Sequence, residues 1–267
     1  MNEVGVSSWS LHRLLGEFWA EDHPGAQRHH PQTPSTGLPL LELPAQLRSN
    51  GYTMLQVCHF HFPELGQAYL EEFRSELARN EIRLDALLID DGDLTAANGD
   101  THEQWISGWL HVAETLGADR ARVIAGRAAP TPETIRVSGT RLRRLARNHS
   151  GIRVVTENWH ELLSSPSAVL DLLDQCGGDV GLLIDLANWD GVNKQAQLEQ
   201  IAFQAETCHA KANFGPGGLD ISEFKETLST VHNAGYRGPF ALVYDGPDAN
   251  EWDALREERT AVHEAIR

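Results

Sequence analysis

Three short segments of the chain carry side chains that can bind a metal ion: VVTENWH with Glu157, GLLIDLANW with Asp185 and ETCHAKANF with His209. Aliphatic runs without polar alternation are typical of strands buried on both faces of a parallel sheet. The carboxyl ends of such strands are where α/β folds bind ligands. Two carboxylates and an imidazole that converge there would suit Mn, Mg, Co or Zn.

Strand parity extends this prediction. Side chains alternate between the two faces of a strand, so Lys211 points the same way as His209, one layer further out toward a substrate, whereas Cys208 points away. Trp9 and Trp159 close apolar strands and could form the walls of a sugar pocket, although large aromatic residues are usually buried simply for their area. The alternative for each metal-binding candidate is a single hydrogen bond at a strand end. Three consecutive strand ends favour the metal.

Other polar residues follow predicted strands with less specific spacing. His59 and His61 in QVCHFHFP alternate, which could place both on one face as extra metal ligands or substrate contacts, and we favour a single pocket histidine over two ligands. In LLIDDGDLT, the sequence does not separate substrate binding from turn capping for Asp90, Asp91 and Asp93, and we favour turn capping.

Strand-like and amphipathic segments alternate along the whole chain. The expected strands are Val4–Ser8, Met54–Cys58, Leu84–Ile89, Ala121–Ala125, Arg153–Glu157, Val180–Asp185, Thr207–Lys211 and Phe240–Asp245. The expected helices are Tyr69–Arg79, His102–Leu116, Arg141–Asn148, Ser167–Cys176, Leu198–Glu206, Ile221–Ala234 and Trp252–Ile266. This alternation, without a GxGxxG or GxxxxGK[ST] nucleotide motif, predicts an α/β fold with one (β/α)8 TIM barrel rather than a doubly wound sheet. Residues 1–267 are expected to form a single domain.

The segment 21–39 is rich in proline and glycine and cannot form regular structure. Because it follows the first strand, we expect a long loop over the mouth of the barrel, which would act as a lid or as a subunit contact in a homo-oligomer. Its histidines His23, His29 and His30 are interpreted as solvated side chains.

The composition excludes several classes of protein. A net charge of −16 opposes binding to a nucleic acid backbone. No apolar stretch approaches the roughly 20 residues of a membrane span, and the start of the sequence has no signal-peptide pattern, so we expect a cytoplasmic protein without a membrane role. The three cysteines have no CxxC spacing, which predicts neither disulfides nor a cysteine zinc site.

These motifs, with the ending AGYRGPFALVYDGP, resemble the xylose isomerase-like TIM barrels, the sugar phosphate isomerase/epimerase superfamily that includes endonuclease IV and inosose dehydratase. The similarity runs over essentially the whole chain. It implies metal ligands after the fifth, sixth, seventh and eighth strands, namely Glu, Asp, His and Glu. The first three match Glu157, Asp185 and His209.

The sequence departs from the family pattern at several polar positions. Val243 stands where the resemblance implies the fourth ligand, and Asp245, two residues on with the same parity, is expected to replace it as a ligand or catalytic base. Gln56 stands where many relatives carry a glutamate. Asn188 stands where relatives often carry a histidine, and we expect it to contact substrate.

The resemblance implies a divalent-metal-dependent isomerase or epimerase of a small sugar or cyclitol, which acts through an enediolate. Glu157 would remove the carbon-bound proton, and Lys211 would polarise a carbonyl. Val243 removes one of the two acid/base groups that epimerisation usually needs, so isomerisation, or dehydration like that of inosose dehydratase, stays open. A barrel that has lost catalysis and binds sugar is the other alternative. The net charge and missing ligands disfavour an endonuclease IV-like phosphodiesterase.

Overall fold

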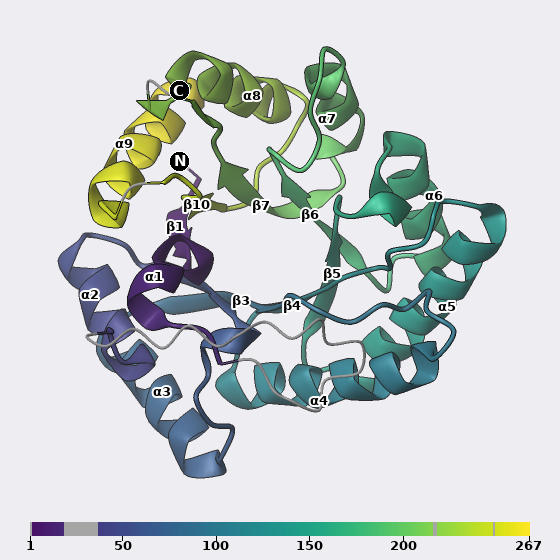
Figure 1. Ribbon diagram of the computed structural model, residues 1–267, viewed down its shortest axis with the longest axis horizontal. Helices are drawn as coiled ribbons and strands as arrows, with labels where there is room; N and C mark the ends of the chain where they lie inside the picture. Colours follow the sequence, from purple (N-terminus) through teal and green to yellow (C-terminus); the bar gives the residue numbers. More distant parts are fainter. Residues whose placement is uncertain (1, 19–36, 216–217, 248) are drawn as a thin grey trace.

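Eight parallel strands of the described chain close into a barrel in the order β1-β10-β7-β6-β5-β4-β3-β2 (Figure 1). The computed structural model describes residues 2–18, 37–215, 218–247 and 249–267. The barrel strands are β1 (Val4–Ser7), β2 (Met54–Cys58), β3 (Arg83–Ile89), β4 (Arg120–Val123), β5 (Arg153–Glu157), β6 (Gly181–Asp185), β7 (Ala205–Lys211) and β10 (Phe240–Val243). The prediction of a (β/α)8 barrel is confirmed.

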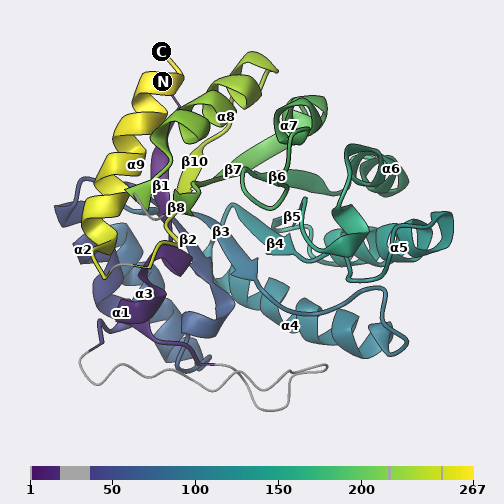
Figure 2. The same ribbon diagram turned by 45° about the horizontal axis from the view of Figure 1, so that its top comes forward.

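Helices surround the strands as an outer layer, as Figure 2 shows. They are α1 (His12–Leu15), α2 (Leu43–Ser49), α3 (Gln67–Arg79), α4 (Gly99–Leu116), α5 (Pro132–Asn148), α6 (Pro166–Cys176), α7 (Lys194–Ala202), α8 (Ile221–Asn233) and α9 (Glu251–Ala265). Short 3-10 helices follow β1 (Ser8–Leu11), precede α2 (Leu40–Glu42), follow β2 (His59–His61) and follow β5 (Glu161–Leu163). No helix among the described residues is long and apolar enough to cross a lipid bilayer.

Several helix boundaries differ from the sequence-based expectation, and two of these differences have a clear local cause. The predicted helix Leu198–Glu206 ends at Ala202, because Ala205 already pairs with Leu182 of β6 and begins β7. Helix α5 begins at Pro132, nine positions before the expected start. The Thr131 hydroxyl caps it by accepting a hydrogen bond from the Thr134 amide, and a proline at the first helical position is favourable there.

The apolar residues form two layers that follow strand parity. The lumen of the barrel holds a small cluster of Cys58, Phe60, Ala86, Leu88, Val155 and Leu183, with Trp9 packed against it. The larger cluster lies between strands and helices and includes Cys208. Since Cys208 lies in the outer layer, the predicted parity of β7 is confirmed and His209 faces the lumen.

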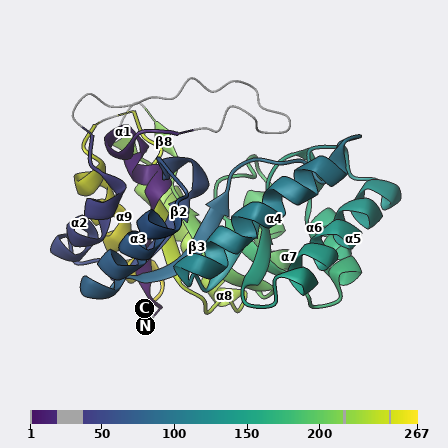
Figure 3. The same cartoon turned by 90° about the horizontal axis from the view of Figure 1, so that it is seen from below.

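The two ends of the barrel are distinct in the side view of Figure 3. Helix α1 and the small antiparallel pair β8 (Phe214–Gly215) and β9 (Gly218–Leu219) lie at the carboxyl end of the strands. Most of the predicted loop 21–39, with His23, His29 and His30, lies outside the described residues. The carboxyl end of the strands is the side on which the candidate site is found.

Candidate metal and substrate site

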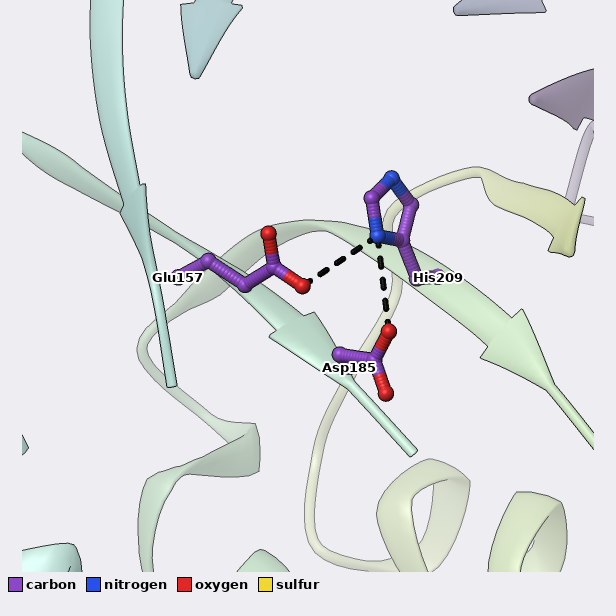
Figure 4. A group of neighbouring side chains, drawn as sticks. All are labelled: Glu157, Asp185 and His209. Atoms are coloured by element: carbon purple, nitrogen blue, oxygen red, sulfur yellow. Dashed lines mark ion pairs between the residues drawn. The ribbon is translucent and has the colours of Figure 1, made fainter. Parts of the chain in front are cut away.

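Glu157, Asp185 and His209 converge at the carboxyl end of three neighbouring strands (Figure 4). Each offers one ligand atom, and these atoms all lie within 4.8 Å of one another. His209 Nδ1 is 3.4 Å from Glu157 Oε1 and 3.5 Å from Asp185 Oδ2. All three side chains are buried. The structure therefore brings together the three residues that the sequence predicted as ligands.

The loop after β6 orients the Asp185 carboxylate. Its Oδ1 accepts hydrogen bonds from the backbone amides of Ala187 at 2.7 Å and Asn188 at 2.9 Å, while Oδ2 faces His209. The Asn158 side chain accepts from the Asp185 amide at 2.7 Å and donates to its carbonyl at 3.1 Å. These bonds fix the end of β6 against the end of β5, so the carboxylate keeps one oxygen free of backbone partners.

Gln56 sets the protonation pattern of the His209 ring. Its amide nitrogen lies 2.7 Å from Asp85 Oδ2 and 2.9 Å from Thr207 Oγ1, and its oxygen lies 2.8 Å from His209 Nε2. A carboxylate can only accept, so the amide nitrogen must face Asp85 and the oxygen must accept a hydrogen bond from His209 Nε2. The ring thus keeps its proton on Nε2 and turns Nδ1 toward Glu157 and Asp185, as in metal-binding histidines.

The charges around His209 attract a cation. Burial alone would lower the pKa of His209, but the charge of Glu157 and hydrogen bonding and charge from Asp185 raise it to about 9. A divalent cation bound between the carboxylates would replace the proton on Nδ1. Two carboxylates and a correctly oriented imidazole fit such an ion, and Glu157, Asp185 and His209 would hold it.

These residues form part of the wall of a cavity of about 360 Å³. Small-molecule sites span about 300–1,000 Å³, so the cavity fits a sugar-sized ligand. The predicted substrate contacts Trp9, Trp159, Asn188 and Lys211 also line it. Asn188 donates to Glu157 Oε1 at 2.8 Å, which ties a cavity residue to a candidate ligand.

Asp245 lies apart from the candidate ligands. Strand β10 ends at Val243, which lines the cavity, and Asp245 follows at the mouth with 41% of its side chain exposed. Its carboxylate is 2.8 Å from Lys211 Nζ and accepts from Trp9 Nε1 at 3.3 Å. The expectation that shared parity would carry Asp245 to the metal is not met, because the strand ends before it.

Lys211 is a cation in this setting. Burial lowers the pKa of Lys211, but the charge of Asp185 and the hydrogen bond and charge of Asp245 raise it above its usual value. The ammonium group thus stays protonated at neutral pH and faces the cavity from the layer above His209. It can stabilise negative charge that develops on a substrate oxygen.

His59 and His61 do not line the cavity. The segment after β2 forms a 3-10 helix instead of continuing as a strand, so their spacing no longer places them on one face. His59 Nδ1 accepts from the Asp90 amide at 3.1 Å, and its ring packs on Trp109. His61 Nδ1 lies 2.6 Å from the Gly16 carbonyl oxygen. Both residues predicted to contact substrate are therefore buried in the packed interior and do not face the cavity.

Arg122 is the main site residue that the sequence analysis missed. It is buried in β4, its Nε lies 3.1 Å from Glu157 Oε2, and it forms an ion pair with Asp90, which also lines the cavity. Burial would raise the pKa of Asp90, but the Arg122 charge holds it well below its usual range. The predicted turn-capping role is therefore wrong for Asp90, which is an ion-pair partner of Arg122. An arginine inside an apolar strand was the available signal, because arginine is rarely fully buried unless paired.

His160 was also missed. It lines the cavity with backbone φ of 56° and ψ of −179°, in a region populated almost only by glycine. Such a conformation costs about 1–3 kcal/mol and persists only where the surroundings enforce it.

The chain belongs to the xylose isomerase-like TIM barrel family, whose description matches residues 44–265. The fold and the motifs at Glu157, Asp185 and His209 had indicated this family. No curated protein sequence matches the chain.

Solved structures with the same fold span almost the whole chain. A xylose isomerase-like TIM barrel protein from Mycobacterium smegmatis in complex with magnesium has 15% identity and a TM-score of 0.72, with 100% of this chain and 98% of that chain covered. D-Psicose 3-epimerase from Clostridium cellulolyticum H10, with D-tagatose, has 12% identity and a TM-score of 0.70, with 99% of both chains covered.

A third structure is the probable 3-DHS dehydratase AsbF of petrobactin synthesis from Bacillus anthracis. It has 14% identity and a TM-score of 0.68, with 98% of this chain and 99% of that chain covered. At these identities the likeness establishes the fold.

Proposed function

We propose that this protein is a divalent-metal-dependent isomerase or epimerase of a small sugar or sugar derivative, and that the whole chain acts as one domain. The observation that carries the proposal is the convergence of Glu157, Asp185 and His209 on one point of a sugar-sized cavity. Family membership supports an enzyme of this class. The net charge of −16 favours a small-molecule substrate over a nucleic acid.

The residues of the cavity suit proton transfer beside a carbonyl. A bound divalent ion would supply Lewis-acid polarisation of neighbouring substrate oxygens. We assign the Glu157 carboxylate to accept the carbon-bound proton. Its Oε2 is buried beside Arg122 Nε at 3.1 Å and makes no hydrogen bond among the described residues. Lys211 holds its proton and stabilises the enediolate oxygen from the cavity wall.

Isomerisation fits the cavity better than epimerisation. Epimerisation at one carbon usually needs acid/base groups on both faces of the enediolate, and Val243 supplies none. In isomerisation the carboxylate that removed the proton returns it to the neighbouring carbon, while the hydroxyl proton passes from one substrate oxygen to the other. Dehydration beside a carbonyl can also use one carboxylate, which removes the carbon-bound proton and gives it to the departing hydroxyl so that water leaves. A lyase like inosose dehydratase is therefore the second candidate, and the fold shared with a probable dehydratase is compatible with it.

Elemental analysis of protein purified without chelator tests the metal. We expect roughly one divalent ion per chain in the wild type, since the three ligands define one site. Glu157→Gln and His209→Ala should each lose it, because each removes a ligand or its charge. Lys194→Met serves as a control, since Lys194 pairs with Glu223 away from the cavity.

A wild-type chain that stays free of metal after incubation with Mn²⁺, Co²⁺ or Zn²⁺ would contradict the proposal. The protein would then be better described as a sugar-binding barrel that has lost catalysis. Bound metal that is lost in both ligand variants would justify assays of aldose–ketose interconversion by NMR.

A further inference from the structure

The wall of the cavity contains an aromatic stack made by two consecutive residues. The rings of Trp159 and His160 lie with centroids 4.2 Å apart and planes inclined by 22°, and both residues line the cavity. The Arg122 guanidinium also lies over the Trp159 ring, 5.1 Å from its centroid. The imidazole is therefore held in place by stacking, although neither residue is fully buried.

The backbone at His160 is forced into its conformation by anchors on both sides. Before it, the Asn158 side chain pairs with the Asp185 backbone and holds the chain to β6. After it, Leu163 is fully buried and its carbonyl accepts from Trp189 Nε1 at 3.0 Å. The chain between these anchors passes through a positive φ at His160. Glycine would adopt this conformation without strain, so the imidazole is retained at a conformational cost.

Apart from the stacking on Trp159, the imidazole makes no contact among the described residues that would explain this cost. His160 precedes the 3-10 helix Glu161–Leu163 but makes no side-chain capping bond to it. Its Nε2 is buried and has no hydrogen-bond partner among the described residues. Burial and the charges of Arg127 and Arg122 lower the pKa of His160 to about 4, so the ring is neutral. A neutral imidazole has one donor and one acceptor nitrogen, as a sugar hydroxyl requires.

We propose that His160, stacked on Trp159, is a specificity-determining residue that hydrogen-bonds a hydroxyl group of the sugar substrate. The inference rests on the proposed function, because it assumes a polyhydroxylated ligand in this cavity. The strained backbone places the ring against the cavity wall, and a small shift of the ring on ligand binding would bring the buried, unpartnered Nε2 to the substrate hydroxyl. Strained residues are concentrated at ligand sites for this reason.

Calorimetric titration of the Mn²⁺-loaded protein tests this role, with D-tagatose, D-fructose and myo-inositol as probes. The informative variant is His160→Phe, which keeps a stacked ring but removes both nitrogens. We expect its dissociation constant for the bound probe to rise about tenfold or more, because the partner hydroxyl is left unsatisfied. Metal content should be unchanged, since His160 is not among the candidate ligands.

A second variant, His160→Gly, covers the case in which phenylalanine does not fold at this strained position. It should lose the same affinity while relieving the backbone. Glu81→Gly is the matched control, because Glu81 is the other described non-glycine residue with a positive φ, 55°, and it does not line the cavity. This control should bind the probe like the wild type.

The outcomes separate the two proposals. A wild type that binds a probe, with His160→Phe and His160→Gly binding equally well, overturns the role of His160 and leaves the proposed function intact. A wild type that binds none of the three probes overturns both. Weaker binding in both variants, with normal binding in Glu81→Gly, supports the inference.

Discussion

Buried charged side chains are hydrogen-bonded differently at the two ends of the barrel. At the amino end, Oδ1 of Asp85 accepts hydrogen bonds from Arg83 at 2.9 Å and Arg120 at 2.6 Å. Oδ2 of the same carboxylate accepts from Gln56 and Thr207. At the carboxyl end, Glu157 Oε2 and Arg122 Nε, 3.1 Å apart, make no hydrogen bond with the described residues. The Asp85 carboxylate is therefore saturated with hydrogen bonds, whereas the Arg122–Glu157 ion pair leaves hydrogen-bonding capacity unused.

This difference separates stability from binding. A buried carboxylate with four hydrogen-bond donors stabilises the closed barrel. Buried polar atoms without hydrogen-bond partners cost stability unless a bound ligand supplies those partners. Gln56 connects the two ends, because its amide nitrogen binds Asp85 and its oxygen accepts from His209. The saturated network thus orients the imidazole at the open end.

The largest effect is expected from Asp85→Ala. Loss of this carboxylate leaves Arg83, Arg120 and Gln56 without a shared partner, and breaking a buried ion pair costs about 3–5 kcal/mol of the free energy of unfolding. Urea denaturation measures the loss. Asp119→Ala is the control, because Asp119 also pairs with Arg83 but is half exposed, and exposed pairs contribute under about 1 kcal/mol. Equal losses in both variants would show that the amino end is not a saturated network.

Gln56→Leu tests the connection between the two ends. It removes the acceptor that holds the proton of His209 on Nε2, and loss of such an outer partner typically lowers metal affinity by about 10–100-fold. Competition with a chromogenic chelator measures the affinity for Zn²⁺. Thr207→Val should weaken it much less, since Thr207 contacts Gln56 and Asp85 but not His209. Unchanged affinity in Gln56→Leu would separate the network from the metal site.

A smaller effect is expected from Glu258→Gln, which tests whether every unsatisfied buried group marks a site. Glu258 in α9 is buried, its two carboxylate oxygens have no partner among the described residues, and it does not line the cavity. Burial, with a smaller contribution from the Glu257 charge, raises the pKa of Glu258 well above 4.5.

A carboxyl group with a raised pKa in the folded state costs stability at pH values above its unfolded pKa, because only the unfolded chain releases the proton readily. The wild type should therefore lose stability relative to Glu258→Gln as pH rises from about 4.5 toward its folded pKa. Thermal unfolding at a series of pH values measures the difference. A gap that closes with rising pH would contradict this sign, and altered Zn²⁺ affinity would contradict its separation from the site.

The sequence predicted the site at the carboxyl end best where a ligand-type side chain directly follows an apolar strand pattern. Strands β2 and β5 have the predicted limits, and Glu157, Asp185 and His209 meet because parallel strands of a barrel end at one rim. These features are local, since each depends on an apolar run and its last residues.

Contacts that depend on barrel register were not predictable in the same way. Arg122 meets Asp90 and Glu157 only because β4 pairs with β3 so that Arg122 lies beside Leu88. The strain at His160 likewise arises from anchors on neighbouring elements. A single sequence shows neither the register nor the anchors, so the charged wall of the cavity emerged only from the structure.

The smallest effect is expected from Asp245→Asn, which concerns the boundary between the metal site and the mouth. Asp245 binds Lys211 and Trp9 at a half-exposed position, apart from the three candidate ligands. The variant should keep the wild-type metal content, because it removes only one partner of a partly exposed ion pair, worth about 1 kcal/mol or less. Elemental analysis beside Glu157→Gln makes the comparison. Loss of metal in Asp245→Asn would show that Asp245 is a metal ligand after all. It would mean that the carboxyl end rearranges so that Asp245 supplies the fourth ligand that Val243 cannot provide.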